Sequence, residues 1–214
     1  MIKAVLFDLD GTFADTAPDL CHALNRVRAA HALPPLPVEA TRPVTSMGAR
    51  GLLGVGFGIE PEHPEYPLLR EEFLAYYEQG LCRETRVFPG IRELLDGIEQ
   101  RRLKWGIVTN KAERFAIPLM NLLELGARAA CVIGGDTTGK LKPHPDPLLA
   151  ACRVIGVGPE ACVYMGDDRR DVEAGHAAGM RTVAVRYGYL NGGDPGSWGA
   201  GLVIDRPEDL LQHL

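Results

Sequence analysis

The chain has 214 residues, of which 46% are hydrophobic and 24% charged, and its formal net charge is -5. These proportions are typical of a folded globular protein, and the length suits one α/β domain or a core domain with a smaller inserted one. The mild negative charge argues against a nucleic-acid-binding surface, which would show as a basic excess, and no segment has the roughly 18 apolar residues that span a bilayer.

The five cysteines are odd in number and include no C-x-x-C pair, which favours buried free thiols in a reducing compartment. The N-terminal apolar stretch is too short for the core of a signal peptide and runs directly into two aspartates. We therefore predict a cytoplasmic protein.

The first predicted element is a short strand. Lys3–Phe7 is an apolar, partly β-branched run and predicts a fully buried strand. The acidic, glycine-containing segment Asp8–Thr12 ends it. The first polar residues of the chain thus come directly after a buried strand.

The next segment, residues 15–80, has a helical character. Pro18 marks the first turn of a helix that continues through Leu20–Ala30, and a proline-rich stretch follows. Tyr66–Gln79 carries Leu, Phe and Tyr at helical spacing and predicts a second long helix. No strand is predicted in this region.

From Phe88 onward, predicted helices alternate with predicted strands. The helices are expected at Ile91–Arg101, Arg114–Leu123, Asp146–Ile155, Arg170–Ala178 and Pro207–Gln212. The strands are expected at Lys104–Thr109, Ala130–Ile133, Cys162–Met165, Thr182–Val185 and Val203–Ile204. This alternation is typical of a parallel sheet covered by helices on both faces.

These patterns predict an α/β protein with a Rossmann-like parallel sheet core and an inserted small helical cap domain. Residues 1–14 and 82–214 form the predicted core, and residues 15–81 form the predicted cap. Sites in open parallel sheets lie beyond the carboxyl ends of the strands. The polar residues that follow the predicted strands are therefore the candidate site.

Two acidic pairs follow predicted strands. Asp8 and Asp10 lie two residues apart on extended chain, so both face one small space, where charges about 4 Å apart repel by roughly 4 kcal/mol at an effective dielectric near 20. A single such pair is more often a solvated turn or a helix cap. A second pair, Asp167–Asp168, at another strand end favours a site for Mg²⁺, which prefers oxygen ligands.

A phosphate-binding set is also present. The Thr109 hydroxyl, Asn110 and the backbone N–H groups at a strand-to-helix junction offer donors to phosphate oxygens. Lys142 offers a compact positive charge in a loop stiffened by prolines, and Lys140 is a neighbouring alternative. We prefer Lys142 because prolines flank it.

Four segments in order resemble the motifs of the haloacid dehalogenase superfamily. They are FDLDGT (Phe7–Thr12), VTN (Val108–Asn110), KPHP (Lys142–Pro145) and GDDRRD (Gly166–Asp171). The helical insertion after the first motif matches the position of the family's small cap. The chain is further similar to phosphoglycolate phosphatases, and WGIVTNK, VRYGY and SWGAGLVID are similar to a bacterial branch that acts on N-acetylmuramic acid 6-phosphate.

The resemblance implies the following roles. Asp8 is the nucleophile that forms an aspartyl-phosphate, and Asp10 is the general acid and then the base for water. Thr109 and Lys142 hold the phosphoryl oxygens. Asp8, the main-chain carbonyl of Asp10 and Asp167 bind Mg²⁺.

Two further acids carry implied supporting roles. Asp168 and Asp171 would hold the metal's waters or position Lys142, although phosphoglycolate phosphatases commonly have Ser or Thr at the position of Asp168. Dehalogenases of the superfamily lack the second aspartate, so Asp10 favours phosphoryl transfer over carbon–halogen cleavage.

Arg50 is the cap residue that we expect to bind substrate. Its guanidinium can grip a carboxylate, which both glycolate and the lactyl arm of muramic acid carry, although a surface salt bridge is the plainer interpretation of such an arginine. We predict a small phosphorylated metabolite as partner, and a monomer or homodimer.

The expected activity is a Mg²⁺-dependent phosphomonoester hydrolase of phosphoglycolate phosphatase type. An N-acetylmuramic acid 6-phosphate phosphatase, a β-phosphoglucomutase-like mutase and a non-catalytic protein on the same fold are the alternatives.

Overall fold

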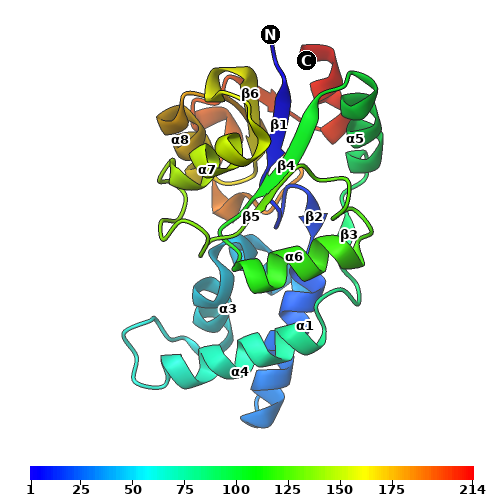
Figure 1. Ribbon diagram of the computed structural model, residues 1–214. Coiled ribbons are helices and arrows are strands. Elements are labelled where there is room, and N and C mark those ends of the chain that lie inside the picture. The colour runs from blue at the N-terminus through cyan, green and yellow to red at the C-terminus, as the bar shows by residue number, and fades with distance from the viewer.

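A six-stranded parallel sheet forms the centre of the computed structural model, which describes residues 1–214. Its strand order is β5-β4-β1-β6-β7-β8, so the first strand lies in the middle (Figure 1). The strands of this sheet are β1 (Ala4–Phe7), β4 (Lys104–Val108), β5 (Val132–Ile133), β6 (Cys162–Gly166), β7 (Arg181–Val185) and β8 (Leu202–Ile204). The predicted parallel α/β architecture is confirmed.

Helices cover both faces of the sheet, as predicted. The helices after residue 90 are α5 (Ile91–Gln100), α6 (Glu113–Leu122), α7 (Asp146–Ile155) and α8 (Arg169–Ala178), with short 3₁₀ helices η2 (Pro159–Ala161), η3 (Leu190–Gly192), η4 (Pro195–Ser197) and η5 (Pro207–His213). Alternate residues of β1 point to opposite faces: Ala4 and Leu6 join a cluster with α7 and α8, whereas Val5 and Phe7 join the larger cluster with α5 and α6.

The helices of residues 17–79 pack against one another beyond the carboxyl end of β1 (Figure 1). They are α1 (Ala17–Ala30), α2 (Val38–Thr41), the 3₁₀ helix η1 (Arg42–Met47), α3 (Gly48–Phe57) and α4 (Tyr66–Gln79). Their apolar faces continue the larger core cluster through Leu24, Leu53 and Phe73. This packing places a helical layer over the strand ends where the polar residues lie.

A two-stranded antiparallel ribbon joins the helical layer to the sheet. β2 (Ala14–Asp15) pairs with β3 (Arg86–Val87), and the Phe88 N–H donates to the Phe13 carbonyl at 3.1 Å. Neither strand is predicted from the sequence. The ribbon lies where the chain leaves the sheet region and where it returns.

All five cysteines are free and four of them are buried, as expected. No helix of this structure combines the length and the apolar character that crossing a bilayer requires.

Candidate active site

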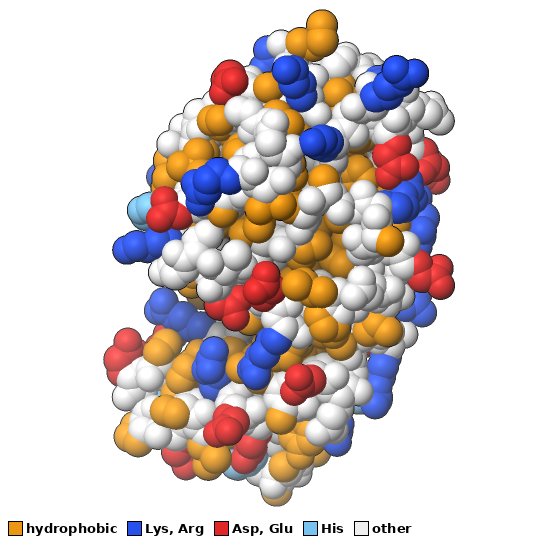
Figure 2. All heavy atoms as spheres, viewed as in Figure 1, with side chains coloured by type: hydrophobic (Ala, Val, Ile, Leu, Met, Phe, Trp, Pro, Cys, Tyr) orange, Lys and Arg blue, Asp and Glu red, His pale blue; other side chains and the backbone are white.

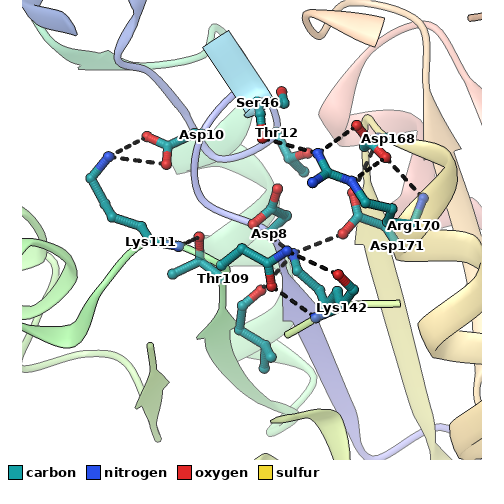
Figure 3. Close-up of polar contacts among 12 residues, drawn as sticks. Asp8, Asp10, Thr12, Ser46, Thr109, Lys111, Lys142, Asp168, Arg170 and Asp171 are labelled. Carbon is teal, nitrogen blue, oxygen red and sulfur yellow. Dashed lines mark hydrogen bonds and ion pairs between the residues drawn. The ribbon is translucent and has the colours of Figure 1, made fainter. Parts of the chain in front are cut away.

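The ends of three neighbouring strands bring the predicted residues together (Figure 3). Asp8 follows β1, Thr109 follows β4 and Asp167 follows β6. Backbone hydrogen bonding continues past the end of β1, where Asp8 N donates to the Met165 carbonyl at 2.9 Å. β1 lies between β4 and β6, so the three side chains start from adjacent positions. The structure therefore brings these side chains together at the sheet edge where the sequence predicts a site.

Three carboxylates form a buried group that could hold a metal ion. One oxygen each of Asp8, Asp167 and Asp171 lies within 4.8 Å of the others. Burial raises the pKa of Asp8 to about 6, with Lys142 opposing this and Asp171 adding to it. Burial, Asp8 and Asp171 together raise the pKa of Asp167 well above its usual range. The site thus carries more negative charge than its protein neighbours neutralise, which suits a cation.

Asp8, the nucleophile predicted from the sequence, contributes a buried carboxylate oxygen to this group. Asp8 Oδ1 is buried and accepts no hydrogen bond, although Lys142 Nζ lies 2.8 Å away as an ion pair. Gly11, with φ of +88°, borders the same space, and a Cβ there would overlap the Asp167 carboxylate. A buried carboxylate oxygen without a hydrogen bond, next to space that is open only because residue 11 is glycine, is suited to bind a metal ion or to attack a substrate.

Lys142 is the buried cation of the site. Its Nζ lies 2.8 Å from Asp171 and donates to the Tyr164 hydroxyl at 2.7 Å, and its side chain is only 3% exposed. Asn110 fixes its backbone: Nδ2 donates to the Lys142 carbonyl at 3.0 Å, and Oδ1 accepts from the Lys142 N–H at 2.9 Å. Asn110 therefore positions Lys142. The preference for Lys142 over Lys140, which is exposed, agrees with this placement.

The side chain of Asp10 lies outside the carboxylate group. Lys111 Nζ donates to both of its oxygens, at 2.9 and 3.0 Å, and the Thr16 hydroxyl donates at 2.6 Å. The Lys111 ammonium is 7% exposed, and its pKa is raised by Asp10 and Tyr77 against the opposing effect of burial. Asp10 is thus held at the side of the site nearer the helical layer.

Asp168 connects the metal group to the helical layer. Its carboxylate caps α8 by accepting from Arg170 N at 2.9 Å, and it receives both Nε and Nη2 of Arg170 at 2.8 Å. Arg170 also donates to the Ser46 carbonyl in η1 at 2.9 Å (Figure 3). The Ser46 hydroxyl lies 3.4 Å from Asp167. Asp171, in contrast, pairs with Lys142, as one of its predicted roles requires.

Tyr189 supports the junction between sheet and helices. Its hydroxyl accepts from the N–H groups of Thr16 and Ala17 at 2.7 and 2.9 Å and donates to Asp15 at 2.8 Å, so it substitutes for a side-chain cap at the start of α1. Its own N–H donates to Asp167 at 2.8 Å. One residue therefore contacts both the metal group and the junction.

Replacing Tyr189 by Phe should lower the free energy of unfolding by about 1–3 kcal/mol. The change leaves two N–H groups at a helix start and one carboxylate without their shared partner. Urea unfolding followed by circular dichroism measures this. A loss below about 0.3 kcal/mol would show that water replaces the hydroxyl at no cost.

Arg50 lies at the rim of the site. Its side chain is 59% exposed and forms an ion pair with the similarly exposed Glu60 at 3.1 Å. This is the surface salt bridge that is the plainer interpretation of such an arginine. Arg50 nevertheless lines the same cavity as Asp8 and Lys142. Substrate binding by Arg50 stays a prediction.

A cavity of about 350 Å³ lies between the sheet edge and the helical layer. Asp8, Thr109 and Lys142 line its floor side, and Phe73, Leu74 and Tyr77 of α4 line the helical side. Figure 2 shows Lys and Arg side chains, with acidic side chains beside them, around the hollow where the two parts meet. The cavity is therefore lined by charged groups of both signs and by apolar side chains.

Several functional candidates escaped the sequence analysis. Lys111 follows the VTN motif directly, so its position was a usable signal. Arg170 lies inside the GDDRRD motif and Tyr189 ends the VRYGY segment, but their contacts with η1 and α1 depend on the tertiary fold.

Comparisons with known proteins agree with this geometry. The family model for haloacid dehalogenase-like hydrolases matches residues 5–185. The chain is 44% identical to an N-acetylmuramic acid 6-phosphate phosphatase of Pseudomonas aeruginosa PAO1, over 100% of this chain and 95% of that protein. It is 43% identical to a phosphoglycolate phosphatase of Xanthomonas campestris pv. campestris strain 8004, over 98% and 95%.

Its fold is also similar to the crystal structure of a predicted phosphoglycolate phosphatase from Haemophilus somnus 129PT. The TM-score is 0.88 at 26% identity, and the match covers 99% of this chain and 97% of that one. The chain therefore belongs to the haloacid dehalogenase-like hydrolases and is a phosphatase, a phosphoric monoester hydrolase, of that family.

Proposed function

We propose that the protein is a Mg²⁺-dependent phosphatase that works through an aspartyl-phosphate on Asp8. The observation that carries this proposal is the buried Asp8 Oδ1, which has no hydrogen bond and lies 2.8 Å from the Lys142 ammonium. A buried carboxylate oxygen that contacts a cation is placed to attack a phosphoryl group that the cation attracts.

Each residue then has a defined part. Asp8 bonds to phosphorus while the ester P–O bond breaks, and Asp10 gives its proton to the departing alkoxide oxygen. Asp10 then takes a proton from the water that attacks the aspartyl-phosphate, and inorganic phosphate leaves as Asp8 is regenerated. Lys142 and the Thr109 hydroxyl contact the phosphoryl oxygens throughout.

The metal ligands are proposed to be Asp8, Asp167 and the main-chain carbonyl of Asp10. Oxygen ligands of this kind suit Mg²⁺, which would neutralise charge on the phosphoryl oxygens. Asp171 lies in the same cluster of three carboxylates, but it forms an ion pair with Lys142 at 2.8 Å. Its proposed role is therefore to hold the Lys142 ammonium in place.

Mg²⁺ should be required for activity, and the affinity of the site for Mg²⁺ should decrease when the pH is lowered. Chelation should remove activity, and added Mg²⁺ should restore it. The folded-state pKa of Asp8 is raised to about 6, so the carboxyl binds a proton below that pH in competition with the metal. We expect the apparent affinity to drop about tenfold per pH unit below 6 for one competing proton. Calorimetric titration at pH 5.0 and pH 7.5 measures it, and equal affinities would contradict the assignment of Asp8 as a ligand.

Residues 15–81 are proposed to be the cap domain that selects the substrate, and residues 1–14 and 82–214 the catalytic core. The cavity of about 350 Å³ falls in the class that encloses ligands well above glycolate in size, about 300–1,000 Å³. It favours N-acetylmuramic acid 6-phosphate, the substrate in the name of the 44% identical relative. Phosphoglycolate is the second candidate, favoured by the 43% identical relative.

A panel of phosphate esters tests the function. Phosphoglycolate, N-acetylmuramic acid 6-phosphate, glucose 1-phosphate and pyrophosphate are compared by release of inorganic phosphate in the presence of Mg²⁺. We expect the highest kcat/KM with N-acetylmuramic acid 6-phosphate. No release without a bisphosphate activator, together with isomerisation of the sugar phosphate, would instead identify a mutase.

A further inference from the structure

The hydroxyl of Tyr77 is a buried donor without an acceptor. Tyr77 lies on α4, its side chain is 1% exposed, and no protein group accepts a hydrogen bond from its hydroxyl. The residue lines the same cavity as Asp8 and Asp10. Buried hydroxyl groups normally find a partner, because an unpaired one destabilises the fold. A ligand that enters this cavity is a partner that the protein alone lacks.

Packing fixes this tyrosine. Its ring stacks on Phe73 at a centroid distance of 6.5 Å and lies 5.5 Å from Phe115 of α6. A rigid ring offers its hydroxyl in one direction at little entropic cost. Tyr77 therefore belongs to a preformed surface of the cavity.

Lys111 lies beside Tyr77 and gives this surface a positive charge. Its Nζ is 4.7 Å from the Tyr77 ring centroid, and Asp10 is the carboxylate it contacts. Burial raises the pKa of Tyr77 to about 12 although Lys111 opposes this, so the phenol is neutral and can donate near neutral pH. An ammonium and a hydroxyl donor side by side suit a negatively charged acceptor.

The position of Tyr77 and Lys111 indicates which part of the substrate they would contact. Asp10 faces the leaving alkoxide in the proposed reaction, and Lys111 bonds to Asp10. Lys142 contacts the phosphoryl group in the proposed reaction and pairs with Asp8 and Asp171. It lies on the side of Asp8 that faces away from Asp10 (Figure 3). Tyr77 and Lys111 thus lie on the leaving-group side of the cavity.

We propose that Tyr77 and Lys111 form a subsite for a carboxylate on the leaving group, with Tyr77 as its specificity-determining donor. This inference rests on the proposed phosphatase function and names the substrate class, a phosphate ester of a hydroxy acid or of an acid-bearing sugar. Arg50, the residue predicted from the sequence for this task, has a side chain that is 59% exposed, whereas the Tyr77 side chain is 1% exposed. A buried donor discriminates more strongly than an exposed one between substrates with and without a carboxylate, because water cannot reach it to replace a missing acceptor.

Tyr77→Phe tests the subsite with two matched substrate pairs. N-acetylmuramic acid 6-phosphate is compared with N-acetylglucosamine 6-phosphate, and phosphoglycolate with ethyl phosphate, because each second member lacks the carboxylate. For whichever acid the enzyme hydrolyses, the kcat/KM ratio of the pair should fall at least tenfold in Tyr77→Phe. The melting temperature of the ligand-free variant should rise by about 2–4 °C, since an unpaired buried hydroxyl is removed.

Tyr76→Phe is the control, because Tyr76 is the adjacent tyrosine of α4 and contacts Arg26 outside the cavity. It should leave the ratio unchanged. An unchanged ratio in Tyr77→Phe, or a lower melting temperature that reveals a structural partner for the hydroxyl, would overturn the proposal. A wild-type enzyme that hydrolyses both members of a pair equally, or only esters without a carboxylate, overturns the subsite alone, whereas one that releases phosphate from no ester overturns the proposed function as well.

Discussion

Asp8→Asn should lower phosphate release by a factor of about 10⁴ or more while the fold persists. The amide keeps the shape of the carboxylate but is not a nucleophile that forms an acyl phosphate. Lys142 keeps Asp171 at 2.8 Å as its partner, so the buried cation stays neutralised. Phosphate release by protein purified from a phosphatase-deficient host measures the effect.

Asp205→Asn serves as its control, because Asp205 is exposed and pairs only with Arg186 at 3.5 Å. This variant should keep wild-type activity. Activity within tenfold of the wild type in Asp8→Asn would remove Asp8 from the role of nucleophile.

The second large effect is expected from Lys142→Met. Removal of this ammonium leaves Asp8 and Asp171 buried without their shared cation, which should cost about 3–5 kcal/mol of stability without metal. Activity should fall about 10³-fold, because the phosphoryl group loses its charge partner. Because Mg²⁺ supplies positive charge to the same carboxylates, it should recover part of the lost stability.

Urea unfolding with and without Mg²⁺ measures the Lys142→Met effect, with Lys140→Met as control. Lys140 is exposed, two residues away in the same loop, so its loss should change stability by less than about 0.5 kcal/mol. Equal effects of the two substitutions would contradict a structural and catalytic role confined to Lys142.

The core strands and long helices were predictable because their signals are local. Asp146–Ile155 and Tyr66–Gln79 have the predicted bounds, and β4 ends one residue before the predicted end. Apolar runs and helical periodicity specify such elements within one stretch of chain. β2 and β3 were missed because each has two residues and exists only through pairing across the inserted helices.

The part of the candidate site that could be predicted consists of residues that directly follow strands. Asp8, Thr109 and Asp167 follow three adjacent strands, so the topology alone brings them together. The contact of Asp10 with Lys111 joins residues 101 positions apart, and that of Tyr189 with Thr16 joins residues 173 positions apart. No periodicity encodes such contacts, because they depend on how the helical layer packs over the sheet.

The central claim is that Asp8 becomes the phosphoryl carrier. A crystal structure of the protein with Mg²⁺ and beryllium fluoride, which mimics a phosphoryl group on a carboxylate, tests it most directly. We expect beryllium bonded to an Asp8 carboxylate oxygen, with its fluorides near Lys142 and Thr109. A beryllium fluoride group bound away from Asp8, or bonded to Asp10 or Asp167, would contradict the account.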